Sequence, residues 1–477
     1  MCIADSLQKD VQFHTLSVMI LFMKQVDFEN GNTAVNIAQQ AVPMFVAQVI
    51  NLLYSIVDRI YIARIPGEGT AALGGIGLCF PVITLITAFT NLYGSGGAPL
   101  FAIARGRRRD DEATRIMNTS FRLEIMTGLV LMILGSVFAR PILYAFGASD
   151  LSIPYALAYL RIYILGILFV MTATGMNPFI NAQGFSQVGM LTVTIGAVAN
   201  IVLDPIFIFV LGLGVQGAAL ATILSQGLSA LFAFRFLTSP SSAAVYRLQR
   251  KGQRLLPELK TSLNIISLGL SAFVMQFTNG LVTAVCNSVL MTWGGEIYVS
   301  VMTILSSLRQ VMEVPVFAVV EGASPILSYN YGARRPARVR EGMKIMALAA
   351  GIYTLFCWLA VERFPAVLLK VFTADPVLTA AALPAMHLYF FAFIFMTFQH
   401  SAQTTFKALG KKNKAIFFSL FRKVIIVVPL TILLPRYFGL GTDGVFIAEP
   451  ISNVIGGLAA FTTMLLTVLP ELREMEK

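Results

Sequence analysis

The sequence predicts an all-α polytopic membrane protein with twelve transmembrane helices, arranged as two six-helix bundles that are parallel repeats of one another. Three observations support this prediction. Hydrophobic residues make up 57% of the 477 residues and charged residues only 12%, whereas soluble domains have about 45–50% and about 25%. The apolar residues gather in twelve long stretches, and several motifs recur at one nearly constant spacing.

The twelve stretches are each long enough to cross a bilayer, which takes about 20 apolar residues in a helix. Helices are the natural choice because lipid offers no hydrogen-bond partner to a free backbone group. The stretches lie at about 38–63, 71–104, 116–140, 155–181, 188–211, 215–238, 263–292, 296–331, 342–363, 380–406, 415–435 and 444–468. Before them, the short apolar run Val18–Met23 is expected to belong to a cytoplasmic N-terminal segment and not to a signal peptide.

Positive charge alternates between the connectors. Those after the second, sixth, eighth and tenth stretches hold twenty Lys and Arg residues, and the connectors on the other side hold five. The positive-inside rule therefore predicts a cytoplasmic-membrane protein with both termini in the cytoplasm. The net charge of +11 follows from this orientation, so no nucleic-acid partner is expected.

An internal repeat divides the chain. GGAPLFAIARGRR (Gly96–Arg108) resembles GASPILSYNYGARR (Gly322–Arg335) at an offset of 226, and GLGVQGAALA (Gly212–Ala221) resembles GLGTDGVFIA (Gly439–Ala448) at 227. Six helices per half is an even number, so both halves have the same orientation, which suits alternating access with substrate held between them. The predicted parts are the N-terminal segment 1–35, the first bundle 36–238, a linker 239–262, the second bundle 263–470 and a tail 471–477.

Enzyme motifs are missing from the sequence. It contains no P-loop, HExxH or GxSxG string, and its four cysteines form no CxxC pair. The strings GLGVQG and GLGTDG match GxGxxG but lie between two membrane stretches, so we expect tight helical hairpins there and no dinucleotide site. We therefore expect no enzymatic activity, no cofactor and no metal apart from a possible Na⁺, and transport would draw on an ion gradient.

Acidic residues inside the apolar stretches indicate a cation or proton site in the first half. Asp58 lies in the first stretch, Asp204 in the fifth with Asn200 one turn deeper, and Thr222 in the sixth. At about 1.5 Å per residue these groups lie roughly 8–11 Å below the same surface. Burial of such groups is costly unless they are solvated or paired. The alternative is structural: Asp58 would pair with the adjacent arginine, and Asp204 would cap a kink at the following proline.

The second half carries a different set of ionisable residues. Arg309 and Glu313 are i,i+4 neighbours and are expected to pair, whereas Glu321 has no helical partner and is a candidate to face a central cavity. Cys286 stands at the repeat position of Asp58, so the carboxylate pair is confined to the first half. The residues assigned to a substrate cavity are Glu321, Gln276, Asn279, Asn177 and Glu313.

The sequence resembles the MATE (multidrug and toxic compound extrusion) family, and within it the MepA-like branch. The resemblance rests on VDRIYIA (Val57–Ala63), NIVLDPIFIF (Asn200–Phe209), GAALATILSQ (Gly217–Gln226), EGASPILSYNYGARRPARV (Glu321–Val339) and AEPISN (Ala448–Asn453). It implies two six-helix bundles in a V, and export of cationic or amphipathic drugs in exchange for Na⁺ or H⁺. The family's site residues match Asp58, Asn200, Asp204, Thr222, Asn51 and Glu321.

Two departures from the family pattern leave the coupling ion open. Arg59 directly follows the acid of the first helix, and the helix 7 carboxylate of the NorM-type branch is missing. The predicted function is a secondary antiporter, expected to be a monomer, that exports organic cations through a Phe- and Met-rich cavity. The alternative is a flippase for lipids or lipid-linked precursors, which needs buried cations to meet phosphate. The buried ionisable residues are expected to be mainly acidic, which disfavours the flippase.

Overall fold

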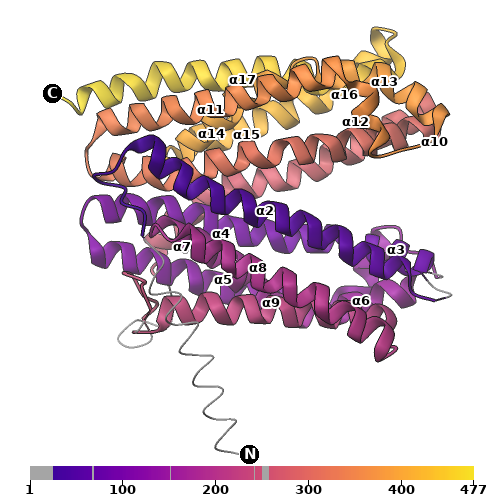
Figure 1. Ribbon diagram of the computed structural model, residues 1–477, viewed down its shortest axis with the longest axis horizontal. Coiled ribbons are helices and arrows are strands. Elements are labelled where there is room, and N and C mark those ends of the chain that lie inside the picture. The colour runs from indigo at the N-terminus through magenta and orange to yellow at the C-terminus, as the bar shows by residue number, and fades with distance from the viewer. Residues whose placement is uncertain (1–24, 67–68, 151, 241, 250–256) are drawn as a thin grey trace, which may run out of the picture. The chain divides into compact units, whose positions relative to one another are not determined.

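The computed structural model describes residues 25–66, 69–150, 152–240, 242–249 and 257–477. The predicted N-terminal run Val18–Met23 and part of the predicted linker lie outside these residues. Every regular element in the described part is helical (Figure 1).

The first half of the chain follows the six predicted stretches closely, with two interruptions. The fourth stretch bends by 59° between α6 and α7, and the second is broken between α3 and α4. The elements are α2 (Thr33–Ala63), α3 (Gly69–Gly77), α4 (Phe80–Gly106), α5 (Asp110–Ala145), α6 (Ile153–Leu165), α7 (Ile167–Ala182), α8 (Ser186–Pro205), the π-helical η1 (Ile206–Val210) and α9 (Gly214–Thr238).

The second half shows the same succession. Its first element, α10, has non-helical φ and ψ angles of 70° and −164° at Gly295, between the predicted stretches 263–292 and 296–331. The elements are α10 (Leu259–Gly332), α11 (Pro336–Arg363), α12 (Pro365–Lys370), α13 (Pro376–Phe390), the 3₁₀ turn η2 (Phe393–Phe395), α14 (Met396–Ala408), α15 (Lys412–Leu420), the π-helical η3 (Phe421–Val427), α16 (Val428–Tyr437) and α17 (Gly441–Glu474).

The helices of the described part confirm the predicted fold class. Nine are long and apolar enough to cross a membrane, or up to eleven if each bent pair counts as one span. The 74 residues of α10 would extend about 110 Å at 1.5 Å per residue, far beyond the ~30 Å hydrocarbon layer. Dividing α10 at Gly295 therefore brings the number of spans to twelve.

The unusual backbone angles of the first half recur at the equivalent positions of the second half. Left-handed φ angles, which are rare outside glycine, recur at equivalent positions of the two halves: 56° at Arg108 and 54° at Arg334, 65° at Gly212 and 68° at Gly439, and 52° at Gly214 and 51° at Gly441. The two Gly-x-Gly turns each join two helices, which confirms the helical-hairpin interpretation of both GxGxxG strings.

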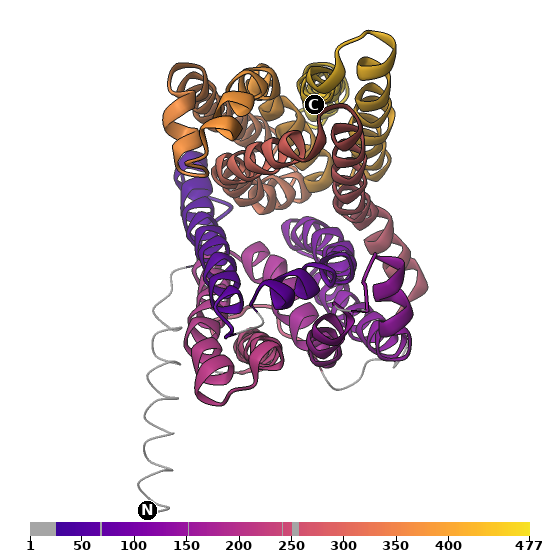
Figure 2. The ribbon, with the colours of Figure 1, turned by 90° about the vertical axis from the view of Figure 1, so that its right-hand side faces the viewer.

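Two compact units divide the chain, and they exchange the starts of their first helices. Unit 1 comprises residues up to Gly31 and Val42–Ile266, and unit 2 comprises Asn32–Ala41 and Ser267–Lys477. The start of α2 thus belongs to unit 2, where Thr33 Oγ1 donates to Glu341 Oε2 at 2.6 Å. The start of α10 belongs to unit 1. Viewed nearly along their axes, the helices within each unit pack side by side (Figure 2).

Candidate functional site

A pair of carboxyl groups lies inside unit 1, where α2 supplies Asp58 and the last turn of α8 supplies Asp204. The two groups are close enough to share a hydrogen bond if one carries a proton. Asp58 Oδ1 and Asp204 Oδ2 are buried and have no hydrogen-bond partner among the described residues. Asn200 Nδ2 donates to Asp204 Oδ1 at 3.3 Å. Two buried carboxylates without a donor between them repel each other, so a proton or cation at this point would stabilise the pair.

The structural alternatives predicted for these acids are only partly seen. Arg59 lies with its guanidinium carbon 5.1 Å from the centre of the Phe80 ring, and within the described structure no ion pair joins it to Asp58. Asp204 does precede an irregularity, because α8 ends at Pro205 and continues as the π-helical η1. Proline removes a backbone donor, and such π-helical turns are frequent at functional sites.

Two tyrosines, Tyr54 and Tyr159, lie near the acid pair, and neither was predicted from the sequence. Tyr54 stands one turn before Asp58 on α2 and is electrostatically coupled to both acids. Tyr159 lies near Thr222, and its ring stacks on that of Tyr163 with centroids 5.9 Å apart. The i,i+4 spacing of Tyr54 and Asp58 could have indicated from the sequence that the two side chains lie on the same face of the helix. The phenols add hydroxyl groups beside the acid pair.

A cavity of about 200 Å³ lies beside the acid pair in unit 1. It contains no charged lining residue. Four residues predicted from the sequence line it, namely Asn51, Asn177, Asn200 and Thr222. Other lining residues are Gln48, Tyr54, Thr174, Thr192, Gly196, Ser225, Gln226 and Ser229. Asn200 therefore belongs both to the acid pair and to the cavity, because its side-chain amide donates to Asp204 and the residue also lines the cavity.

The other four predicted substrate residues lie in unit 2. Glu321, expected to have no partner one turn away on its own helix, forms an ion pair with Lys407 of α14, with 2.9 Å between Oε1 and Nζ. Gln276 is half-buried. Asn279 is exposed, and its carbonyl oxygen accepts from Thr283 Oγ1 at 3.0 Å. Asn177 belongs instead to unit 1, where it lines the cavity together with Asn51, Asn200 and Thr222.

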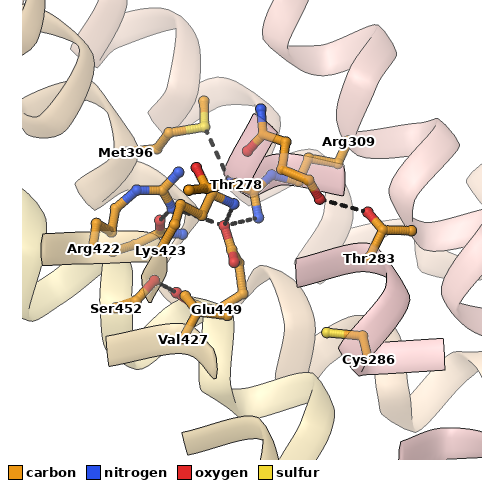
Figure 3. Close-up of polar contacts among 12 residues, drawn as sticks. Thr278, Thr283, Cys286, Arg309, Met396, Arg422, Lys423, Val427, Glu449 and Ser452 are labelled. Atoms are coloured by element: carbon orange, nitrogen blue, oxygen red, sulfur yellow. Dashed lines mark hydrogen bonds and ion pairs between the residues drawn. The ribbon is translucent and has the colours of Figure 1, made fainter. Parts of the chain in front are cut away.

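Glu313 belongs to a buried network that we call the unit 2 charge cluster, defined as Arg309, Glu313, Arg422, Lys423 and Glu449. Figure 3 shows Arg309, Arg422, Lys423 and Glu449 of this cluster. Arg309 Nε contacts Glu313 Oε1 at 2.6 Å, which confirms the expected i,i+4 pair, and Arg309 Nη1 contacts Glu449 Oε1 at 2.8 Å. The same oxygen of Glu449 accepts from Arg422 Nη1 at 2.8 Å and from Lys423 Nζ at 2.9 Å. Three cations thus converge on one carboxylate oxygen.

The expectation that the buried ionisable residues are mainly acidic holds for the described part of unit 1 but is wrong for unit 2. In the described part of unit 1 the buried acids are Glu124 and Asp204 and no Lys or Arg is buried, whereas in unit 2 the buried charged residues are Arg309, Lys407, Arg422, Lys423 and Glu449. Lys407 lies in the last turn of α14, one residue beyond the predicted stretch 380–406. Arg422 and Lys423 could have been recognised from the sequence, because two adjacent cations inside the stretch 415–435 are as unusual in a membrane helix as an acid is.

A further buried acid, Glu124 of α5, was also missed. Its side chain is inaccessible to solvent, and neither carboxyl oxygen has a hydrogen-bond partner among the described residues. It packs against Gly175 of α7, where a Cβ would lie 2.1 Å from Glu124 Oε1. An isolated carboxylate cannot remain charged in such a place at reasonable cost, so Glu124 is best accommodated as a neutral acid. Its position within the stretch 116–140 was the available signal.

Comparisons with known proteins show the family to which the chain belongs. The MatE family model matches residues 43–206 and again residues 271–433, so one model covers both repeats. The multidrug export protein MepA of Staphylococcus haemolyticus (strain JCSC1435) is 24% identical over 416 residues, which are 87% of this chain and 89% of MepA.

Solved structures share the fold. One is the outward-facing conformation of a multidrug resistance MATE family transporter of the MOP superfamily, with a TM-score of 0.87, 24% identity and coverage of 94% of this chain and 99% of that one. Another is a MOP superfamily transporter from Pyrococcus furiosus, described by the words "reverse polarity of binding pocket suggests different function". Its TM-score is 0.87, its identity 24%, and the coverage is 95% of this chain and 99% of that one.

Proposed function

Because the chain belongs to the MatE family of transporters, we propose that it exports organic cations and amphipathic drugs across the cytoplasmic membrane in exchange for H⁺ or Na⁺. It is a multi-pass membrane transporter and not an enzyme. MepA, a multidrug export protein, supports the substrate class. Both termini lie in the cytoplasm in this proposal, in accordance with the positive-inside rule, and the working form is a monomer.

The observation that carries the proposal is the acid pair of Asp58 and Asp204. Each has a buried oxygen without a donor, and a coupling ion would supply the missing positive charge. In this mechanism H⁺ or Na⁺ enters from outside, neutralises the pair and changes the packing of α2. Asn51 of the same helix lines the neighbouring cavity, so a movement of α2 would alter that cavity. Occupation by the ion and retention of a cationic drug then exclude each other.

The test is ethidium transport in proteoliposomes under an imposed pH gradient or an imposed Na⁺ gradient, applied one at a time. Asp58→Asn and Asp204→Asn should each abolish gradient-driven transport and leave the yield of folded protein unchanged, because each keeps the shape and removes the charge. The matched control is Asp150→Asn, an exposed acid that accepts from Tyr144 Oη at 2.8 Å, which should transport normally. Normal ethidium transport by both acid variants would refute the site.

A flippase for lipids or lipid-linked precursors is the second candidate. The observation that favours it is the set of buried cations in unit 2, which could meet a phosphate. The words used of the Pyrococcus furiosus transporter, reverse polarity of the binding pocket, describe a contrast of the same kind. Translocation of a fluorescent phosphatidylglycerol between leaflets, without any gradient-driven ethidium transport, would select the flippase.

A further inference from the structure

Two members of the unit 2 charge cluster, Lys423 and Glu449, and the adjoining Asn453 stand at positions that correspond, through the internal repeat, to the lining of the unit 1 cavity. At the offset of 227 residues fixed by the two Gly-x-Gly turns, Lys423, Glu449 and Asn453 are the counterparts of Gly196, Thr222 and Gln226. All three counterparts line the unit 1 cavity. Unit 2 therefore has ionic and amide side chains at the place where unit 1 has an uncharged hollow.

The two equivalent places differ in the sign of their charge. In unit 1 the nearby ionisable groups are the carboxyls of Asp58 and Asp204, and no lysine or arginine in the described part of that unit is buried. In unit 2, with every group ionised, the cluster holds three cations and two carboxylates. A network built only for stability would be expected to balance its charges, because an unpaired buried charge costs several kcal/mol.

Hydrogen-bond donors of the cluster remain unused. Arg422 donates only through Nη1, to Glu449 Oε1 and to Asn453 Oδ1 at 2.9 Å, so its Nε and Nη2 make no hydrogen bond within the described structure. Lys423 uses one of its three protons. The side chains of Arg309, Arg422 and Lys423 keep 10%, 9% and 11% of their surface exposed. The unused donors are thus buried but not sealed off.

Apolar and aromatic groups border the cluster. The guanidinium carbon of Arg309 lies 5.6 Å from the centre of the Tyr389 ring, and its Nη2 is 3.9 Å from the sulfur of Met396. Gly456 makes room for Arg422, since a Cβ there would lie 3.0 Å from Arg422 Cγ. Such surroundings suit a ligand with one anionic end and an apolar body.

We propose that the unit 2 charge cluster is an anion site, which binds the carboxylate or phosphate oxygens of an amphipathic ligand through Arg422 and Lys423. This inference rests on the proposed transport function and adds a substrate class to it. Unit 1 takes a cation at its acid pair, and unit 2 takes an oxyanion at the place that corresponds to the cavity beside that pair. Arginine forks and lysine ammonium groups are the usual partners of such oxyanions.

The experiment measures equilibrium binding of radiolabelled benzoate to the purified full-length protein in phosphatidylcholine nanodiscs. Benzylammonium, of the same size and opposite charge, serves as the second probe. Lys423→Met and Arg422→Met should each weaken benzoate binding about ten- to a hundredfold, the range for loss of a charged hydrogen bond. Lys423→Arg keeps the charge and should retain benzoate binding. Lys412→Met removes an exposed lysine outside the cluster and is the matched control.

The outcomes separate the possibilities. Benzoate binding that is equal in the wild type, Lys423→Met and Arg422→Met, with all three proteins monodisperse, overturns the anion site. Wild-type protein that binds benzylammonium but not benzoate overturns it as well. If phosphatidylglycerol in the nanodisc competes with benzoate, the anion is a lipid headgroup; if it does not, the anion belongs to a free amphiphile. Because binding is measured without a gradient, its failure is distinguishable from failure of ethidium transport.

Discussion

Removal of the charge of Glu449 should destabilise unit 2 strongly. Glu449 Oε1 accepts from Arg309, Arg422 and Lys423 at 2.8, 2.8 and 2.9 Å, so Glu449→Gln leaves three buried cations against the single carboxylate of Glu313. Loss of one partner of a buried ionic network costs about 3–5 kcal/mol. For a folding unit of 150–250 residues, 1 kcal/mol shifts the midpoint by about 2–4 °C. The expected decrease in Tm is therefore about 6–20 °C.

Tryptophan fluorescence during heating is a suitable assay. The two tryptophans, Trp293 and Trp358, both lie in unit 2, so their emission reports on the unit that is perturbed. The double variant Glu449→Gln with Lys423→Met removes one charge of each sign and should recover more than half of the lost Tm. A Glu449→Gln protein within 2 °C of the wild type, or a double variant with additive losses, would refute the energetic account of the cluster.

Two further predictions concern other parts of the molecule. Gly175→Ala should lower the free energy of unfolding by about 1–3 kcal/mol through overpacking, because the new Cβ would lie 2.1 Å from Glu124 Oε1. Size-exclusion chromatography after heating measures the loss of stability. The double variant Gly175→Ala with Glu124→Ala should regain much of this stability. Outside the spans, burial is the largest single influence on the pKa of Lys411 and lowers it, but the hydrogen bonds and charges of Glu471 and Tyr331 together outweigh burial and leave the pKa above its ordinary value of 10.5. The ion pair therefore contributes fully below pH 10.5 and is lost as the pH rises through the raised pKa. Lys411→Met should lower the free energy of unfolding by about 0.2–1 kcal/mol, equally at pH 7 and pH 9; a loss that disappears between these two values would contradict the assignment.

The fold could be predicted because each of its determinants is local. Apolar length predicts a span, the distribution of Lys and Arg predicts its direction, and the two Gly-x-Gly strings predict the hairpins that the φ angles at Gly212 and Gly439 then confirm. The break of α10 falls at Gly295, between two stretches that were already separate. The 59° bend between α6 and α7 was not predicted, since no proline marks it and only Gly166 lies at the junction.

The sequence allowed us to predict which ionisable residues lie inside the membrane stretches, but not which residues they contact. Asp58 and Asp204 were found because a charge inside an apolar stretch is conspicuous. The partner of Glu321 is Lys407, 86 residues away, and Glu449 meets cations from α10 and from η3. Such pairs depend on which helices lie side by side, and periodicity within one helix carries no information about that. Glu124 is a different case: its position inside the apolar stretch 116–140 is evident from the sequence, but it was not among the predicted site residues.

The exchange of helix starts between the units has a consequence for dividing the chain. A cut between Thr238 and Leu259 would leave Asn32–Ala41 on the first fragment, although Thr33 bonds to Glu341 and a Cβ on Gly322 would lie 2.8 Å from the Ala41 nitrogen. The same cut would place the opening turns of α10, which belong to unit 1, on the second fragment. Neither fragment would contain a complete unit, so each would need the segment carried by the other fragment to complete its packing.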